Sequence, residues 1–230
     1  MTVRNVLFDL DGTLTDSGEG ICTSLTLAFR EAGLPAPEPT TLQGIIGLPL
    51  RDALRDRLGL STAQMEQVVP LYRAHYAATG VSQGRVYPGI EPLLQMLRDE
   101  GARLFVATAK IRPAALAVLD HFGLLPFFHG VYACTFDGRT ATKPEMVEDL
   151  LLEEGLAPDA TAIIGDHAQD MRSARRNGLK GIGVLWGYGS RESLLAAGAD
   201  ALVESPQDLP PHLGLRNGAR VGNLLSHTLR

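Results

Sequence analysis

Short runs of apolar residues recur along the chain and end at polar or turn-forming residues. The clearest runs are residues 3–8, 103–107, 161–164 and 181–185, with weaker ones at 130–134 and 201–203. Continuous rather than alternating apolar character is typical of strands that are buried on both faces of a parallel sheet. Patterns with the spacing of helices lie between these runs, at residues 90–99, 113–122, 143–154 and 169–177. This alternation predicts βαβ units, and therefore an α/β fold with a doubly wound, Rossmann-like parallel sheet.

Residues 17–85 interrupt the alternation. Ile21, Leu25 and Phe29 fall on one face of a predicted helix, and Ser61 with Gln64 three residues later fits a capping box that opens another. Pro70 predicts a kink in that second helix, and no strand pattern is evident in the segment. We therefore expect a core made of residues 1–16 and 86–210, with residues 17–85 inserted as a helical cap that opens and closes over the site. After Pro210 the pattern loosens, and we expect residues 211–230 to form a frayed tail.

Composition narrows the function classes. The chain has 230 residues, of which 45% are hydrophobic, and a net charge of −5. This is ordinary globular composition, and the negative charge gives no general attraction to nucleic acid or anionic membranes. No apolar run is long enough for a membrane span or a signal peptide, so we expect a cytoplasmic protein. The sequence leaves monomer and homodimer open.

Acidic residues follow two of the predicted strands. Asp9 and Asp11 come directly after the first strand, and two residues apart in extended backbone their carboxylates point the same way. Taken alone, this pair fits a surface Asx turn equally well. Asp166 ends the strand at 161–164, and Asp170 lies one turn into the next helix, where an acidic side chain is also favoured by the helix dipole. Because two acidic clusters at one sheet edge repel each other unless a cation intervenes, they predict a Mg²⁺ site.

Two further residues lie at the same edge of the sheet. Thr108 closes the strand at 103–107 and offers a hydroxyl group, and Lys143 opens a helix where unpaired backbone N–H groups also favour anions. Either residue alone is unremarkable. Together with the two acidic clusters, in this order and each at a strand end or helix start, they predict a site for a phosphate group.

This set of motifs resembles the Mg²⁺-dependent phosphatase branch of the haloacid dehalogenase superfamily. The resemblance covers residues 3 to about 210 and is closest to the phosphoglycolate phosphatases and related 5'-nucleotidases. Their pattern is similar to Asp11-Gly12-Thr13-Leu14-Thr15-Asp16-Ser17, Val86-Tyr87-Pro88-Gly89, His121-Phe122-Gly123-Leu124 and Trp186-Gly187-Tyr188-Gly189-Ser190. The helical insert matches the cap that these enzymes carry between their first and second motifs.

The resemblance implies a role for each motif. Asp9 would be the nucleophile that forms an aspartyl-phosphate, and Asp11 the general acid and base. Thr108 and Lys143 would hold phosphoryl oxygens, with the backbone N–H groups around Leu10, Asp11 and Ala109 completing the phosphate-binding site. Mg²⁺ would be held by Asp9, Asp166 and the backbone carbonyl of Asp11, with Asp170 either as a nearby ligand or as a residue that supports the ligands.

Other positions carry less information. Ala109 stands where a Ser or Asn is frequent in this family, and we expect His167 to be a solvated histidine. Lys110 and the cap residues Arg51 and Arg73 are candidates for binding a second anionic group of the substrate. Each arginine fits a surface charge on a cap helix at least as well.

The implied activity is hydrolysis of a small phosphorylated metabolite, phosphoglycolate first and a 5'-nucleotide as the alternative. A phosphomutase that uses the same phosphoaspartate is a weaker alternative. A signalling receiver domain also combines a phosphorylated Asp, acidic metal ligands, a Thr and a Lys on a parallel sheet. Receiver domains are much shorter, however, and a phosphoprotein that persists without turnover would be needed to support that alternative.

Overall fold

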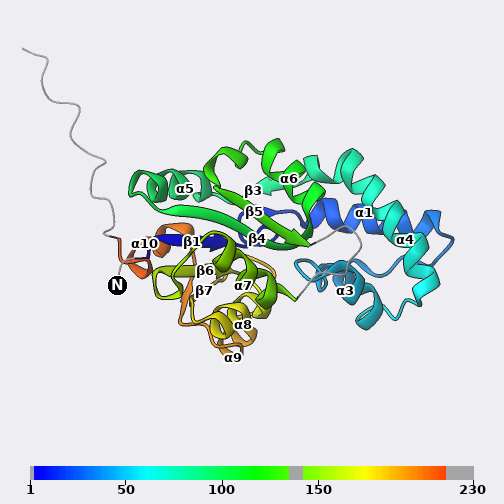
Figure 1. Ribbon diagram of the computed structural model, residues 1–230. Coiled ribbons are helices and arrows are strands. Elements are labelled where there is room, and N and C mark those ends of the chain that lie inside the picture. The colour runs from blue at the N-terminus through cyan, green and yellow to red at the C-terminus, as the bar shows by residue number, and fades with distance from the viewer. Residues whose placement is uncertain (1–2, 135–141, 216–230) are drawn as a thin grey trace, which may run out of the picture.

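The core is a six-stranded, entirely parallel sheet with the strand order β5-β4-β1-β6-β7-β8 (Figure 1). The computed structural model describes residues 3–134 and 142–215. The strands are β1 (Asn5–Phe8), β4 (Arg103–Ile111), β5 (Gly130–Cys134), β6 (Thr161–Gly165), β7 (Lys180–Val184) and β8 (Ala201–Val203). The chain starts in the middle of the sheet, adds β4 and β5 on one side, and then adds β6, β7 and β8 on the other. This is the predicted doubly wound α/β fold, and all six apolar runs are strands.

Helices cover both faces of the sheet. Along β1, Phe8 packs into the cluster that includes α5 (Ile90–Asp99) and α6 (Arg112–His121), while Leu7 packs against α7 (Lys143–Glu153) and α8 (Ala168–Asn177). Because successive side chains of a strand point to opposite faces, a strand between two helix layers must be apolar throughout. The short helix α9 (Arg191–Ala196) packs beside α8, and 3-10 turns occur at Leu125–Phe127, Pro158–Ala160 and Pro206–Asp208.

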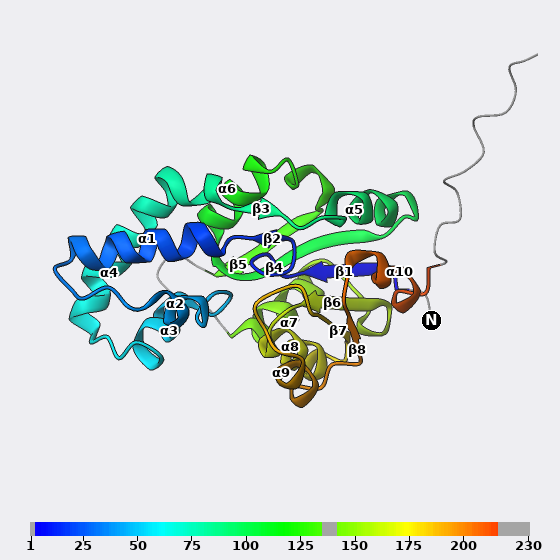
Figure 2. The ribbon, with the colours of Figure 1, turned by 180° about the vertical axis from the view of Figure 1, so that it is seen from behind.

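The inserted segment forms a helical layer beyond one end of the sheet (Figure 2). Its helices are α1 (Gly18–Glu31), α2 (Pro39–Gln43), α3 (Leu50–Asp56) and α4 (Thr62–His75), followed by a π-helical turn, η1 (Tyr76–Gly80), and a 3-10 turn (Val81–Gln83). The predicted capping box at Ser61 and Gln64 is present, and Pro70 lies inside α4. Among the described residues, no helix is long and apolar enough to cross a bilayer.

Two connections join this layer to the core, and they pair with each other. The strands β2 (Thr15–Asp16) and β3 (Arg85–Val86) form an antiparallel pair, which an ion pair of 2.5 Å between Arg85 Nη2 and Asp16 Oδ2 reinforces. Neither of these two strands was predicted, because two-residue strands leave no periodic pattern. The paired connections place both ends of the insert at one point.

The C-terminal part of the described chain packs on the core. In α10 (Leu209–His212) and just after it, Leu209 and Leu213 are fully buried, and the backbone N–H of Val3 donates to the carbonyl of Leu213 at 3.0 Å. Residues 211–215 therefore belong to the core rather than to a frayed tail, because their leucines complete its edge. The rest of the predicted tail, residues 216–230, lies outside the described residues.

Candidate active site

Polar side chains converge where β1, β4 and β6 end and α7 begins. In a doubly wound sheet, this crevice at the carboxyl ends of the strands is where ligands bind. Five of the predicted site residues meet here, and all five are buried: Asp9, Thr108, Lys143, Asp166 and Asp170.

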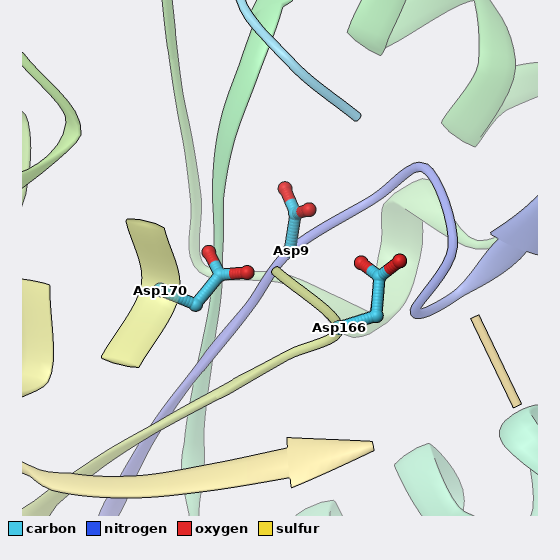
Figure 3. Close-up of side chains that lie close together, drawn as sticks. All are labelled: Asp9, Asp166 and Asp170. Carbon is cyan, nitrogen blue, oxygen red and sulfur yellow. The ribbon is translucent and has the colours of Figure 1, made fainter. Parts of the chain in front are cut away.

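Three carboxylates surround one small space. Asp9, Asp166 and Asp170 each offer an oxygen, and these oxygens all lie within 4.8 Å of one another (Figure 3). Asp9 Oδ2 is buried and has no hydrogen-bond partner within the described part of the chain. A hard cation with oxygen ligands suits such a set, and it would satisfy that oxygen. The residues therefore fit Mg²⁺.

Lys143 supplies the positive charge of the cluster. Its Nζ lies 2.8 Å from Asp9 Oδ1 and 2.5 Å from Asp170 Oδ1, and its side chain is only 2% exposed. Burial by itself lowers the pKa of Lys143, but Asp170 and Asp9 more than offset this, so the pKa is raised and the lysine stays charged. The pKa of Asp9 rises to about 7, because burial and the carboxylates of Asp170 and Asp166 outweigh the attraction of Lys143.

Asp166 is held by groups from three directions. The backbone N–H of Tyr188 donates to its Oδ2 at 2.8 Å, Thr13 Oγ1 donates to its Oδ1 at 3.3 Å, and His167 Nδ1 lies 3.0 Å from Oδ2. The prediction of a solvated His167 was wrong, because its side chain is 13% exposed and pairs with the preceding residue. Gly12, at φ +91°, permits the approach of Asp166, since a Cβ there would lie 2.2 Å from Asp166 Oδ2.

The Asp11 side chain lies apart from the three-carboxylate cluster. Ser17 Oγ donates to Asp11 Oδ1 at 2.6 Å, and Lys110 Nζ donates to Oδ2 at 2.8 Å and to Oδ1 at 3.1 Å. Lys110 was predicted as a candidate for binding the substrate's anionic group, whereas the structure pairs it with Asp11. The Asp11 carboxylate is not among the three grouped carboxylates, and the metal contact predicted for Asp11 was through its backbone carbonyl.

The predicted phosphate-binding residues border the same space. Thr108, Ala109 and Lys143 line the cavity under the cap. The Leu10 side chain is fully buried, so Leu10 can contribute only its backbone. The hydroxyl of Thr108 accepts a hydrogen bond from the backbone N–H of Lys110 at 3.2 Å, which leaves its own proton available to a ligand.

A cavity of about 390 Å³ separates the carboxylates from the cap. Its cap-side wall is largely apolar and carries Ile21, Leu25, Ile46, Leu48, Tyr72 and Tyr76. Arg51 and Arg73 also line it, and Arg51 Nε is buried without a hydrogen-bond partner in the described structure. The charge of Arg51 contributes to a lowered pKa at Arg73, after burial as the larger cause. Both predicted cap residues are thus at the cavity.

The site combines a buried lysine, a threonine hydroxyl and three buried carboxylates that fit a cation, all beneath a cap. A site of this kind on a doubly wound sheet defines a hydrolase that acts on phosphate esters. The family model for haloacid dehalogenase-like hydrolases matches residues 6–184, and the chain belongs to this family. It is a phosphatase of the family, as its relatives also indicate.

Among curated relatives, a 5'-nucleotidase of Pseudomonas aeruginosa is 38% identical over 84% of this chain and 87% of its own length. The tyrosine-protein kinase PtkA of Mycobacterium tuberculosis is 38% identical over 80% of this chain but only 62% of its own length. A phosphoglycolate phosphatase of Aquifex aeolicus is 31% identical over 90% of this chain and 95% of its own length. The crystal structure of a predicted phosphatase from Clostridium acetobutylicum superimposes with a TM-score of 0.86, at 33% identity, over 91% of this chain and 97% of that one.

Sequence reasoning missed several contributors. Ser17 and Tyr188 stand inside the motifs that carried the resemblance. The contact of Ser17 with Asp11 depends on the turn between them, and the contact of Tyr188 with Asp166 joins loops 22 residues apart. Tyr76 fits the apolar face of a helix and gave no other signal. The pairing of Lys110 with Asp11 crosses 99 positions of sequence and could not be seen in either local motif.

Proposed function

We propose that this chain is a Mg²⁺-dependent phosphomonoesterase that works through an aspartyl-phosphate on Asp9. The observation that carries this proposal is the state of the Asp9 carboxylate. Oδ1 is paired with Lys143, Oδ2 is buried with no hydrogen-bond partner among the described residues, and Asp9 belongs to the group of carboxylates that fits a cation. Asp9 also lines the cavity, so a phosphate ester held there can reach its carboxylate.

In the first step, an Asp9 oxygen attacks phosphorus and the bond between phosphorus and the leaving oxygen breaks. Asp11, which enters this step protonated, gives that oxygen its proton. In the second step, Asp11 takes a proton from water as the water attacks phosphorus, and the bond to Asp9 breaks to release phosphate. Lys143 and Thr108 hold phosphoryl oxygens throughout. Bound Mg²⁺, held by Asp9, Asp166 and the Asp11 carbonyl with Asp170 nearby, would supply further positive charge against the phosphoryl oxygens.

Phosphoglycolate is the first candidate substrate, and Arg51 supports it. A small substrate with a second anionic group needs a cation away from the phosphate, and the buried Nε of Arg51 has no hydrogen-bond partner among residues 3–134 and 142–215. An unsatisfied charged donor in a cavity wall favours a ligand with a carboxylate.

A 5'-nucleotide is the second candidate, and the size and walls of the cavity support it. A volume of about 390 Å³ exceeds what a glycolate group needs and falls within the range of pockets that hold larger ligands. The rings of Tyr72 and Tyr76 stack with their centroids 5.7 Å apart and line the wall. Such a surface suits the flat face of a nucleobase.

Phosphate release from phosphoglycolate, 5'-nucleotides and sugar phosphates, each with and without Mg²⁺, tests the activity. We expect Mg²⁺-dependent release that Asp9→Asn abolishes while the circular dichroism spectrum stays unchanged. Normal turnover by folded Asp9→Asn protein would refute the mechanism. A phosphorylated protein that persists without releasing phosphate would support a phospho-accepting signalling module instead.

Arg51→Met separates the two substrates. For phosphoglycolate we expect KM to rise about tenfold, because a charge-assisted contact is lost, whereas for a 5'-nucleotide we expect a smaller change. Arg55→Met is the matched control, since Arg55 lies on the same helix, is exposed and pairs with Asp52 and Asp56. Equal effects of the two variants on phosphoglycolate would exclude a role for Arg51 in substrate binding.

A further inference from the structure

Lys110 and Asp11 form a buried ion pair next to the catalytic cluster. Nζ of Lys110 approaches both carboxylate oxygens of Asp11, at 2.8 and 3.1 Å, and the two side chains are 7% and 8% exposed. The hydroxyl of Ser17 donates to Oδ1 from another direction. The carboxylate that we propose as general acid and base is thus held from two sides, and one of them is a lysine to which the proposed steps give no role.

An irregularity in β4 brings Lys110 to this place. The regular pairing of β4 with β5 runs to Thr108 and resumes only at Ile111, so the register shifts around Ala109 and Lys110. A bulge of this kind re-aims a side chain out of the normal alternation of a strand. The backbone N–H of Lys110 donates to Thr108 Oγ1 at 3.2 Å. Lys110 is therefore fixed by the same strand end that carries Thr108.

The cap contacts Lys110 from the side opposite to the core. Its Nζ lies 4.4 Å from the centroid of the Tyr76 ring, and Tyr76 belongs to η1, the π-helical turn that follows α4. An ammonium group over an aromatic face is attracted to it, most strongly where water is excluded. Tyr76 is itself only 3% exposed. Lys110 is thus the link between Asp11 in the core and an aromatic ring in the cap.

We propose that Lys110 is a positioning residue that orients Asp11 toward the leaving group while the Tyr76 ring of the cap lies on its ammonium group. This inference rests on the proposed role of Asp11 as general acid and base. With Tyr76 in place, the ammonium group is shielded from water and contacts Asp11 alone among the carboxylates of the described residues. When the cap moves away, water reaches Lys110 and competes for its donors, which loosens the carboxylate.

A simpler role for Lys110 would be to bind the substrate's anionic group directly. The two roles predict different kinetics. A residue that binds an anion changes KM for every substrate that carries the anion. A residue that positions the general acid changes the rate of bond breaking, and only where the leaving oxygen needs a proton.

The first experiment compares two substrates in Lys110→Met and Lys110→Arg proteins. One is the best alkyl phosphate found in the activity screen, and the other is 4-nitrophenyl phosphate, whose leaving group departs without a proton. For Lys110→Met we expect kcat/KM to fall at least about tenfold for the alkyl phosphate but less than about threefold for 4-nitrophenyl phosphate. We expect Lys110→Arg, which keeps the charge, to recover much of the loss.

The second experiment tests the link to the cap. Tyr76→Leu removes the aromatic face, and Tyr76→Phe keeps it. We expect Tyr76→Leu to reproduce the leaving-group dependence in weaker form and Tyr76→Phe to be close to the wild type. In the double variant Lys110→Met/Tyr76→Leu, we expect no further loss beyond that of Lys110→Met alone, because both changes act through one contact.

Asp11→Asn keeps the inference and the proposed function separate. If Asp11→Asn shows no dependence on the leaving group, the proposed role of Asp11 fails. If Asp11→Asn shows a dependence on the leaving group and folded Lys110→Met does not, the inference about Lys110 fails while the proposed role of Asp11 stands. A rise in KM of equal size for both substrates would also overturn it, in favour of direct anion binding. If Lys110→Met does not fold, the comparison of Tyr76→Leu with Tyr76→Phe decides the question. Absence of a leaving-group dependence in Tyr76→Leu would then overturn the inference.

Discussion

At the scale of single residues, the site is a set of buried charges that offset one another. Lys143 lies between Asp9 and Asp170, Lys110 faces Asp11, and His167 faces Asp166. Buried ions are tolerated only when they are paired, and removing one partner leaves the other at a high cost in free energy. The histidine differs from the two lysines because its pKa, about 9, lies within the range of pH in which the protein can be studied.

His167 should make the metal-free protein less stable as pH rises. Burial by itself lowers the pKa of His167, but Asp166 more than offsets this and raises the pKa to about 9. A folded-state pKa above the unfolded value of about 6.5 gives stability that is complete below pH 6.5 and is lost as pH rises through 9. We expect the free energy of unfolding, measured with urea in EDTA, to fall by on the order of 1 to 3 kcal/mol across this window.

His167→Gln is the matched variant, and its unfolding free energy should change less over the same window. Asp9, with a pKa of about 7, also titrates in the lower part of the window. Because the pKa of Asp9 is raised, its contribution to stability also falls as pH rises, but most of that fall is complete by pH 7.5. The comparison is therefore sharpest between pH 7.5 and 9. Equal slopes for the wild type and His167→Gln in that interval would show that the pair with Asp166 is not charged in solution.

At the scale of elements, α1 and η1 of the cap pack together through a close backbone contact. A Cβ on Gly20 would lie 1.9 Å from the carbonyl oxygen of Gly80. Only glycine allows this approach, because the obstacle is backbone and cannot move aside as a side chain could. The crossing places η1, and with it Tyr76, against the first cap helix.

Gly20→Ala should therefore destabilise the protein by about 1 to 3 kcal/mol, since the added methyl group forces the two elements apart. Chemical denaturation measures the loss. Gly44→Ala is the control, because Gly44 has a φ of −69° and the nearest atom to a Cβ there is 3.5 Å away. We expect its effect to stay within about 0.5 kcal/mol. Similar losses in both variants would mean that the crossing does not depend on glycine.

The elements also show what the sequence could and could not predict. Asp9, Thr108, Lys143, Asp166 and Asp170 were predicted together, because each lies at a strand end or helix start that the apolar pattern locates. The β2–β3 pair was missed, since two residues carry no period. The direction of Lys110 was missed because it depends on a register shift in β4, and no local pattern encodes a bulge at that position.

At the scale of the whole molecule, the proposed Mg²⁺ site should link the stability of the fold to the cation. Asp9, Asp166 and Asp170 lie within reach of one cation, while Lys143 is the lysine that contacts the cluster in the described structure. Repulsion among the carboxylates opposes folding when no cation is present. A ligand that binds the folded chain and not the unfolded one stabilises it in proportion to the logarithm of its concentration.

We therefore expect Mg²⁺ at about 100 times its dissociation constant to stabilise the fold by about 2.7 kcal/mol. For a chain of this size, that corresponds to a rise of about 5 to 10 °C in Tm. Differential scanning fluorimetry with Mg²⁺ against EDTA measures the shift, without any need for a substrate. Asp166→Asn should lose most of it, whereas Asp159→Asn, at an exposed position in a 3-10 turn, should keep it.

Lys143→Met extends the same measurement to the charge balance of the site. Without its lysine, the cluster holds three buried carboxylates with no ammonium group beside them, and the metal-free protein should lose about 3 to 5 kcal/mol. Mg²⁺ should then raise Tm by more than it does in the wild type, because the cation replaces part of the missing charge. A rise in Tm equal to that of the wild type would mean that Lys143 and the cation act on different carboxylates. That result would contradict a single cation site around Asp9.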